Sequence, residues 1–442
     1  MNNKELISEF QSVVESKILV NKIDQFLCDW RGVYKGSTNF VIFPKTTHEV
    51  SEIIKLANCY DLPIVPQGGN TGLCGGATPD ETGNSILLNL TKLNKIRSID
   101  LIGNTISVEG GCILETILNE VDKNDRIFPI NLAAKGSCTI GGNLATNAGG
   151  INVLKYGSTR DLVLGVEAVL PTGEIINNLT SLHKDNTGYA LHKLLIGSEG
   201  TLGIITAATI KIFQKPKSKI SAFIKVNNIN KSIATLQSLQ SYAGNNIEAF
   251  EIMSKPILEI VHRQFPKINK PFTDIPDLAI LVEFSTTSEL DIISDSSGET
   301  IFQSRIIEIM SMLIDKNQIE DAVISNDGGQ FAIEAKAGDE LAFTAVNYQM
   351  IVVKLTEQMI ANGRLVVEVK EKVTELDEVV VTPENRERFL QVQNEEFKEV
   401  EYEIDRPTEV ENIALSRSER GMQDGINFVN IFKALTKSIQ KN

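Results

Sequence analysis

The stretch PQGGNTGLCGG at residues 66–76 does most to decide the fold of this 442-residue chain. It follows the apolar run LPIV at residues 62–65, which is typical of a buried strand, and it packs five glycines into eleven residues. A tight turn needs only one or two glycines. Without Cβ atoms, successive backbone N–H groups can turn toward an anion and bind it. We therefore expect this segment to hold a phosphate-bearing ligand, and a pyrophosphate fits it best.

Neither of the common nucleotide-binding loops is present in this segment. A Walker A loop ends in Gly-Lys followed by Ser or Thr, and Leu73-Cys74 stands at that place. The Gly-x-Gly-x-x-Gly pattern of a Rossmann turn is also missing. The sequence thus argues against NAD bound in the Rossmann manner.

Two further segments combine glycine with other small residues: AKGSCTIGGNLATNAGG at residues 134–150 and IGSEGTLGII at residues 196–205. Small side chains let a flat or extended ligand lie close to the main chain. Three such segments on one body indicate a long ligand that is held along much of its length. A dinucleotide meets that description better than a mononucleotide.

The chain around these segments alternates short apolar runs with helical periodicity, which predicts a mixed α/β body. Residues 218–330 alternate strand-like and helix-like stretches in an order that suits a split β-α-β unit and a smaller second domain. From about residue 331 glycine becomes rare, acidic residues outnumber basic ones, and the pattern is mainly helical. The predicted helices are residues 5–20, 49–59 and 230–241, and the predicted strands are residues 40–43, 62–66, 85–90, 105–108, 162–170, 203–213, 220–226, 247–252 and 278–284.

The composition limits the function and the location. Lys and Arg number 43 against 57 for Asp and Glu, a formal charge of −14, which argues against dedicated nucleic-acid binding and against constitutive binding to anionic membranes. Apolar residues make up 42%, enough for several cores. No run approaches the roughly 20 apolar residues that span a bilayer, so no transmembrane segment is expected. Five cysteines without a Cys-x-x-Cys pair, and an N-terminus without a signal pattern, predict a reduced, cytoplasmic protein.

Longer stretches around the glycines carry a family resemblance. The chain resembles the FAD-binding domain of the vanillyl-alcohol oxidase / p-cresol methylhydroxylase (PCMH) superfamily, and most of all the FAD-linked D-2-hydroxy-acid dehydrogenases. These include D-2-hydroxyglutarate dehydrogenase, D-lactate dehydrogenase and the FAD-linked chain of glycolate oxidase. The resemblance extends over about residues 25–330. The matching stretches are PIVPQGGNTGL at 63–73, AAKGSCTIGGNLATNAGG at 133–150, YGSTRDLVLGVEAVLPTGE at 156–174, KDNTGYALHKLLIGSEGTLGIIT at 184–206 and IEAFEIMSKP at 247–256.

The resemblance implies an α+β fold with four parts. Residues 1–29 would form an N-terminal helical segment, and residues 30–215 a PCMH-type FAD-binding domain of two α/β subdomains. Residues 216–335 would form a smaller, ferredoxin-like domain on the substrate side. Residues 336–442 contain no stretch that resembles the family and are expected to form a mainly helical, acidic tail.

The resemblance also implies a cofactor site, in which Pro66 to Leu73 take the pyrophosphate of FAD and the other two segments line its adenosine and isoalloxazine. Some members of the superfamily attach the flavin covalently through a loop His or Cys. The three segments contain no His, and their Cys74 and Cys138 are expected to be ordinary thiols, so FAD is expected to bind non-covalently. The predicted cofactor residues are Pro66, Gln67, Gly68, Gly69, Asn70, Thr71, Gly72, Leu73, Gly136, Ser137, Gly141, Gly142, Asn143, Ala145, Asn147, Gly149, Gly200, Gly203 and Ile204.

The activity implied by the resemblance is that of an FAD-linked 2-hydroxy-acid dehydrogenase or oxidase. It would oxidise a small D-2-hydroxy acid, such as 2-hydroxyglutarate, lactate or glycolate, by hydride transfer to flavin N5. The electron acceptor would be an electron-transfer protein or a quinone rather than NAD. No catalytic residue is assigned. His183 and His192, which flank KDNTGY at 184–189, are the candidates for a general base.

The chain departs from the family where the family binds its substrate. In the resembled enzymes a C-terminal Arg-Glu pair grips the acid, and a pair of His residues binds a divalent metal. Here FAIEAK at 331–336 stands in place of the Arg-Glu motif, and no His follows His262, so we expect no metal site. The alternative is a non-catalytic or degraded FAD-binding protein, or a complex subunit, that lacks the family's metal and substrate site.

Overall fold

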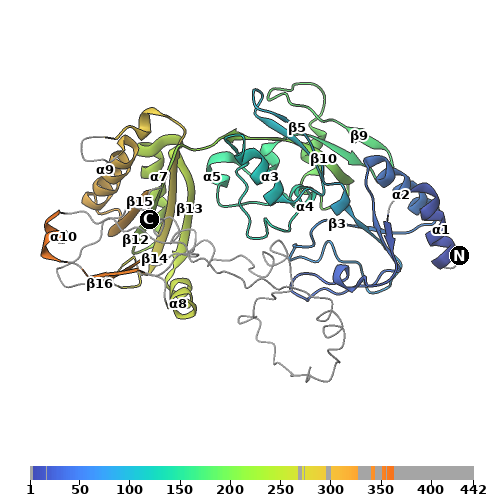
Figure 1. The fold of residues 1–442 in the computed structure, drawn as a ribbon, viewed down its shortest axis with the longest axis horizontal. Coiled ribbons are helices and arrows are strands. Elements are labelled where there is room, and N and C mark those ends of the chain that lie inside the picture. The colour runs from blue at the N-terminus through green and yellow to red at the C-terminus, as the bar shows by residue number, and fades with distance from the viewer. Residues whose placement is uncertain are drawn as a thin grey trace, which may run out of the picture. The chain divides into compact units, whose positions relative to one another are not determined.

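The computed structural model describes residues 3–15, 17–266, 271–272, 274–294, 300–326, 340–343, 351–354 and 356–362 (Figure 1). The described residues up to Asn326 belong to one compact unit, and those from Glu340 to Asn362 belong to a second. Three sheets of four or five strands build the first unit.

The first sheet carries the strand that leads into the first glycine-rich segment. Three of its strands are parallel, and a short antiparallel strand lies at one edge. Helices α1 and α2 pack on one face, where Phe10, Ile53 and Leu88 share a buried core. Helix α2 begins at Thr46, whose side chain accepts a hydrogen bond from the backbone N–H of Glu49. The strands in spatial order are β1 (Lys17–Leu19), β2 (Val41–Phe43), β4 (Ile86–Asn89) and β3 (Ile64–Gln67), and the helices are α1 (Asn3–Val13) and α2 (Thr47–Cys59).

The second sheet is antiparallel throughout and positions the other two glycine-rich segments. Its inner face carries a core that includes Ile106, Leu114, Ile140 and Ile210. The strands in spatial order are β5 (Ile96–Asp100), β6 (Thr105–Glu109), β10 (Ile204–Lys211), β8 (Val163–Val169) and β9 (Ile175–Asn177). The accompanying elements are α3 (Leu114–Asp122), α4 (Ile140–Ala145), α5 (Val153–Tyr156), α6 (Leu191–Leu195) and the small pair β7 (Arg126–Ile127) and β11 (Phe213–Gln214).

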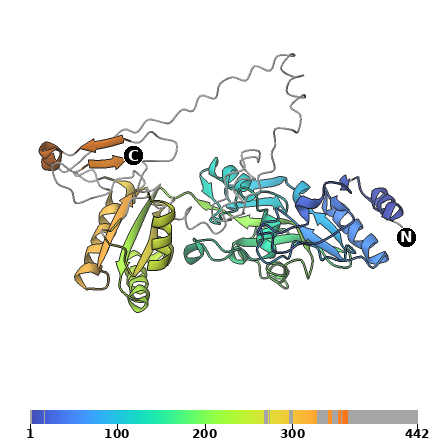
Figure 2. The ribbon, with the colours of Figure 1, turned by 90° about the horizontal axis from the view of Figure 1, so that it is seen from below.

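The third sheet follows directly and is also antiparallel. If its four strands are numbered 1 to 4 along the chain, their spatial order is 2-3-1-4. This is the order of a split β-α-β unit. Helices α7 and α9 bury Leu239 and Phe302 on one face, and α8 packs Leu258 on the other (Figures 1 and 2). The strands in spatial order are β13 (Ile247–Ser254), β14 (Leu278–Thr286), β12 (Ser218–Val226) and β15 (Asp321–Asn326), and the helices are α7 (Ile229–Ala243), α8 (Lys255–Gln264) and α9 (Ile301–Asp315).

One prediction from the pattern was wrong in part, and the prediction of a mainly helical tail is not confirmed. The helix expected over residues 5–20 ends at Val13, and Lys17–Leu19 instead pairs as a strand with β2, because tertiary pairing outweighs a weak local preference. The tail expected to be mainly helical starts its described part with the antiparallel pair β16 (Glu340–Phe343) and β17 (Ile351–Lys354), followed by the short helix α10 (Glu357–Asn362). The β-branched run Ile351-Val352-Val353 favours a strand. The segment 331–336 and the tail beyond 362 lie outside the described residues.

Short 3₁₀ turns connect several elements; they are Asp24–Phe26, Leu90–Lys92, Thr159–Leu162, Gly244–Asn246 and Leu290–Ile292. Among the residues that the structure describes, no helix is both long enough and apolar enough to cross a membrane.

Candidate functional site

The first glycine-rich segment leaves β3 at Gln67, and this side chain holds both ends of the loop together. Its amide nitrogen donates to the carbonyl oxygens of Phe26 (2.9 Å) and Ala77 (2.8 Å), and its amide oxygen accepts from Asn89 (3.2 Å). Only 1% of the surface of Gln67 is exposed, so its side chain has a structural role. It shapes the loop, and a ligand would meet the backbone instead.

Farther along the segment, Asn70 adopts a left-handed backbone (φ 51°), and its side-chain amide donates to the carbonyl oxygen of Cys28 at 2.8 Å. The carbonyl oxygen of Leu73 accepts from the guanidinium of Arg31. Thr71 is half-buried, and Gly72 is exposed with open space around it. The tip of the loop is therefore the part whose backbone remains accessible.

The first and second segments touch at two glycines. A Cβ atom on Gly68 would lie 2.1 Å from the hydroxyl oxygen of Thr139, and one on Gly69 would lie 2.0 Å from the carbonyl oxygen of Ser137. Real side chains do not tolerate such distances, so only glycine allows this approach. The structure thus brings residues 68–69 and 137–139 side by side.

The second segment contains a helix where the sequence suggested only a loop. Helix α4 covers Ile140–Ala145, and its Gly141 packs on Gly110, with N–H to carbonyl oxygen at 2.7 Å and a Cβ position only 2.8 Å from that oxygen. Among the predicted cofactor residues of this segment, Gly136, Gly141 and Asn143 are buried, and Gly142 and Gly149 are exposed.

The third segment closes on the other two. The backbone N–H groups of Gly197 and Glu199 donate to the carbonyl oxygens of Leu144 (3.0 Å) and Ala145 (2.9 Å), at the end of α4. Gly200, which has a left-handed backbone (φ 81°), faces Pro66, with 2.9 Å between its Cβ position and that ring. Gly203 and Ile204 are buried where β10 starts beside β8. All three predicted segments therefore meet in one place.

Arg160 joins two of these segments, and sequence reasoning gave it no role. Its backbone N–H donates to the side-chain oxygen of Asn147 (2.9 Å), and its guanidinium donates to the carbonyl oxygen of Ile196 (2.6 Å). A Cβ atom on Gly197 would lie 2.5 Å from the same guanidinium. The only sequence signal for Arg160 is its place in the stretch YGSTRDLVLG, inside the family resemblance.

A cavity of about 350 Å³ lies where the first and third segments meet. Pockets for small molecules and cofactors occupy about 300–1,000 Å³, so this cavity is at the lower end of that range and has room for a ring system. Three predicted cofactor residues line it: Pro66, Gly200 and Ile204. Its other lining residues are Ile54, Asn58, Asp61, Leu62, Pro63, Ile64, Val169, Pro171 and Thr201.

Several buried polar atoms in the described structure have no hydrogen-bond partner, and one of them, the hydroxyl oxygen of Thr139, lies within the second segment. They include the hydroxyl oxygens of Thr78 and Thr139, the side-chain oxygen of Asn152, Nε of Arg160 and Nδ1 of His192. Buried polar groups are normally hydrogen-bonded, so the Thr139 hydroxyl, which lies beside Gly68 of the first segment, fits a polar ligand there. Phosphate, ribose and flavin all offer partners of this kind.

The two histidine candidates differ in environment. Burial lowers the pKa of His192 on α6, with the nearby charge of Lys193 acting in the same direction, so its imidazole is neutral near pH 7. His183 is exposed, and its Nε2 lies 2.8 Å from the carbonyl oxygen of Gly103. Neither imidazole is placed by a described contact against the glycine-rich segments.

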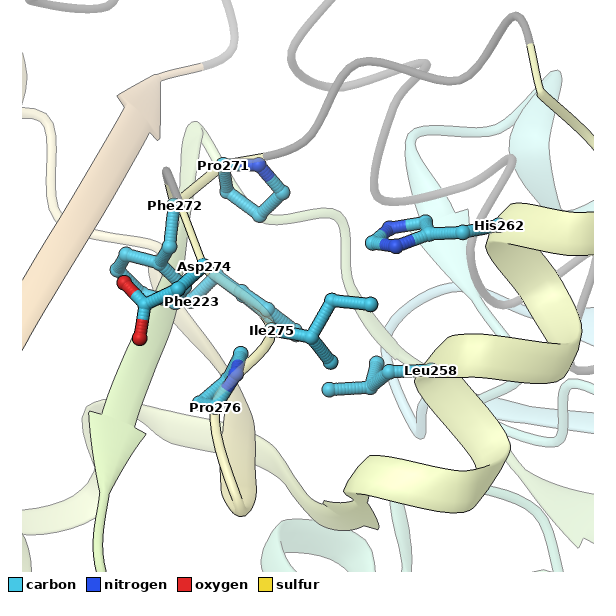
Figure 3. Close-up of a pocket in the computed structure, with 8 residues that line it drawn as sticks. All are labelled: Phe223, Leu258, His262, Pro271, Phe272, Asp274, Ile275 and Pro276. Carbon is cyan, nitrogen blue, oxygen red and sulfur yellow. The ribbon is translucent and has the colours of Figure 1, made fainter.

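His262 lines a second, much smaller pocket between α8 and the third sheet (Figure 3). Leu258, Phe223 and Phe272 surround it, and the space amounts to about 10 Å³. That volume is roughly what one water molecule needs, so this pocket does not hold a substrate.

Thiol and metal chemistry have little support in the described residues. Burial raises the pKa of Cys138 to about 11, and Asn143 donates to its sulfur at 3.6 Å, so this thiol stays protonated. Cys74 is exposed on the first segment. No group of three or more His, Cys, Asp or Glu side chains in the described ranges is arranged to hold a metal ion.

Comparison with known proteins identifies the class. Residues 38–178 match the family model of the FAD binding domain, so this part of the chain is an FAD-binding domain, and FAD is its cofactor. A solved structure of p-cresol methylhydroxylase with substrate bound has a similar fold, with a TM-score of 0.56 at 15% identity over 73% of this chain and 65% of that one. The expected α+β class with a PCMH-type domain is confirmed.

The relatives are more specific. The chain is 37% identical over 311 residues to a putative mitochondrial D-lactate dehydrogenase from Schizosaccharomyces pombe, covering 70% of this chain and 57% of that protein. It is 41% identical over 248 residues to a mitochondrial D-2-hydroxyglutarate dehydrogenase from Danio rerio, covering 56% and 46%. The predicted resemblance to FAD-linked D-2-hydroxy-acid dehydrogenases is thereby confirmed. The chain matches about half of the length of these relatives.

Proposed function

We propose that this protein is an FAD-dependent oxidoreductase that oxidises a small D-2-hydroxy acid, with the hydride passing to flavin N5. The observation that carries the proposal is the meeting of segments 66–76, 134–150 and 196–205 within and beside an FAD-binding domain. The names of the relatives support the substrate class, because D-lactate and D-2-hydroxyglutarate are both small D-2-hydroxy acids. FAD, when bound, supplies the hydride acceptor.

The residues of the three segments would divide the work of holding the cofactor. The backbone around Gly72 and Gly142, which is accessible and unhindered, suits the phosphates. The buried hydroxyl of Thr139 could pair with a phosphate or ribose oxygen. Pro66 and Ile204 offer apolar contact to a ring in the cavity.

His192 is the better of the two candidates for a general base. A base must be unprotonated at the working pH, and burial lowers the pKa of His192. His183 already has its Nε2 against the carbonyl oxygen of Gly103. We therefore propose His192, rather than His183, as the candidate for proton removal from the substrate hydroxyl.

We propose an electron-transfer protein or a quinone as the electron acceptor, because the Rossmann fingerprint for NAD is missing from the sequence. The cytoplasmic location stays a prediction, and both relatives are named as mitochondrial proteins.

A second candidate function is FAD binding without turnover, as an idle protein or as one component of a complex. The observation that favours it is the lack of any His after His262, which removes the imidazole pair that the resembled enzymes use for a divalent metal. A protein that only binds FAD needs the three cofactor segments and no substrate site.

Anaerobic flavin bleaching separates the two candidates. The FAD-loaded protein is mixed with D-lactate, D-2-hydroxyglutarate or glycolate, with and without a divalent metal, and the absorbance of oxidised flavin near 450 nm is followed. L-lactate is the matched control for D-lactate. Bleaching by a D-acid but not by its L-enantiomer supports the dehydrogenase. A flavin that is bound but stays oxidised with all three acids contradicts it and favours the second candidate.

A further inference from the structure

Glu248, on strand β13, is the most deeply buried carboxylate of the third sheet, with 0% of its surface exposed. A buried carboxylate is costly unless charged or hydrogen-bonding groups surround it. One such group is Lys219 on β12, whose Nζ lies 2.8 Å from a Glu248 oxygen. This pair lies within the sheet.

The other groups come from outside the third sheet, from helix α5 of the FAD-binding half, which contacts β13 (Figure 1). The phenol oxygen of Tyr156 lies 3.5 Å from the second oxygen of Glu248. Nζ of the preceding Lys155 donates to the hydroxyl of Ser285 on β14 at 2.6 Å. Helix α5 thus brings two polar side chains to the buried Glu248 and Ser285, and with the partly exposed Lys219 they form one cluster of Lys155, Tyr156, Lys219, Glu248 and Ser285.

The charges in this cluster depend on one another. Burial lowers the pKa of Lys155, the charge of Glu248 opposes that shift, and the charge of Lys219 adds to it. Burial and the nearby Glu248 both raise the pKa of Tyr156, which keeps the phenol neutral. Glu248 is therefore in direct contact with the ammonium of Lys219 and also interacts electrostatically with that of Lys155. Without Glu248 the two ammonium groups would repel each other across the contact between α5 and the sheet.

Helix α5 is also close in sequence to the cofactor segments. It begins at Val153, three residues after Gly150, the last residue of the second segment. Gly150 is tightly packed, since a Cβ atom there would lie 2.8 Å from the carbonyl oxygen of Asn131. The ring of Tyr156 also packs on Phe213, 4.8 Å between centroids, just before the chain crosses to β12. A shift of α5 would therefore move both the second glycine-rich segment and the link between β11 and β12.

We propose that Glu248 is a positioning residue, which fixes the third sheet against the FAD-binding half through Lys155 and Tyr156. Its function is to set the distance between the cofactor segments and the domain that follows them. The docking role rests on the contacts that Glu248 and Ser285 of the third sheet make with Tyr156 and Lys155 of α5. Any effect of Glu248 on turnover depends on the proposed function. The docking of α5 on the third sheet does not depend on it.

The test is hydrogen exchange, measured by mass spectrometry, on FAD-loaded wild type and Glu248→Gln. The backbone amides to follow are those of α5 and of the link between β11 and β12. In that link the backbone N–H of Lys215 donates to the carbonyl oxygen of Asp125 (3.2 Å), and the backbone N–H of Lys217 donates to that of Thr286 (2.8 Å). We expect exchange there to rise by about tenfold in the variant, because the contact opens more often. The FAD content should stay at the wild-type value. Unchanged exchange at these amides, or loss of FAD with no change in exchange, would overturn the proposal.

Two further variants make the test specific. Glu251→Gln changes the same charge on the same strand outside the cluster, and it should leave exchange at α5 and the link between β11 and β12 as in the wild type. Adding Lys155→Met to Glu248→Gln removes the uncompensated ammonium, so the double variant should exchange more slowly than Glu248→Gln alone. Additive acceleration in the double variant would contradict the shared-charge model. Because none of these measurements needs turnover, a failed bleaching experiment would not count against the cluster.

Discussion

The Cβ position of Gly69 lies 2.0 Å from the carbonyl oxygen of Ser137, although the two residues are far apart in the sequence. The first segment follows a strand of the parallel sheet, and the second leads into α4 beside the antiparallel sheet. This backbone contact is one of the places where the two halves of the FAD-binding part meet. The glycines of this family pattern therefore have two uses, close packing at some positions and ligand access at others.

Gly69→Ala should disturb the contact while Gly72→Ala should not. Alanine at 69 must push Ser137 away, and such overpacking typically costs about 1–3 kcal/mol of folding stability. The space around Gly72 is open, so alanine there should leave stability within about 0.5 kcal/mol. Urea unfolding of both apoproteins measures the difference. Equal stabilities would show that the segments do not touch as described.

A negative charge at the tip of the first segment should prevent FAD binding without unfolding the protein. Gly72→Asp places a carboxylate where the phosphates are proposed to lie, and like charges repel. Gly72→Asn is the matched neutral control, and Gly142→Asp repeats the test on the exposed face of α4. FAD fluorescence titration should show at least about a tenfold loss of affinity for the Asp variants only. Equal affinities for Gly72→Asp and Gly72→Asn would place the phosphates elsewhere.

The sequence could predict the segments but not how they interlock. Strands such as β3, β8 and β10 were predicted because their apolar runs are bounded by turn residues. Helix α4 was missed because two glycines in IGGNLA lower its helix propensity, and the packing of Gly141 on Gly110 decides the outcome. No local pattern shows that Arg160 reaches Ile196, or that Glu248 lies against α5. Both depend on contacts between residues distant in the chain.

Arg160→Lys should weaken FAD binding even though it keeps the charge. Lysine offers a point charge and cannot reproduce the planar group that reaches the carbonyl oxygen of Ile196. We expect the affinity for FAD to fall by about tenfold and the fine structure of the flavin absorption band to be lost, because the second and third segments lose their link. Affinity and spectrum identical to the wild type would leave Arg160 without the linking role.

Acid should remove the stabilising effect of Glu167. Burial would raise the pKa of this carboxyl, but hydrogen bonds from Arg97, Thr47 and Thr206 outweigh burial and lower it. A lowered pKa means stability that is present above the unfolded-state value near 4.5 and is lost as the pH falls through the folded-state value.

Glu167→Gln should therefore cost about 1–3 kcal/mol at pH 7, because it weakens charged hydrogen bonds to Arg97, and progressively less as the pH falls below 4.5. Urea unfolding of both proteins across this pH range measures the gap. A gap that stays constant down to pH 3 would mean that the ionised carboxylate contributes nothing.

The flavin should come off the protein without breaking a covalent bond. Burial raises the pKa of Cys138 to about 11, which leaves almost no thiolate to react with flavin. Acid precipitation should therefore release all of the flavin into the supernatant, and Cys138→Ser should bind FAD as the wild type does. Yellow colour that stays with the precipitate would show covalent attachment, with the exposed Cys74 as the first residue to substitute.

The most direct measurement is a titration of the purified apoprotein with FAD, with NAD as the competing ligand and the bound flavin identified after release. If the three glycine-rich segments form one cofactor site, the protein binds one FAD per chain and an excess of NAD does not displace it. A protein that binds no FAD, or that releases it in favour of NAD, would contradict the cofactor site on which the proposed function rests.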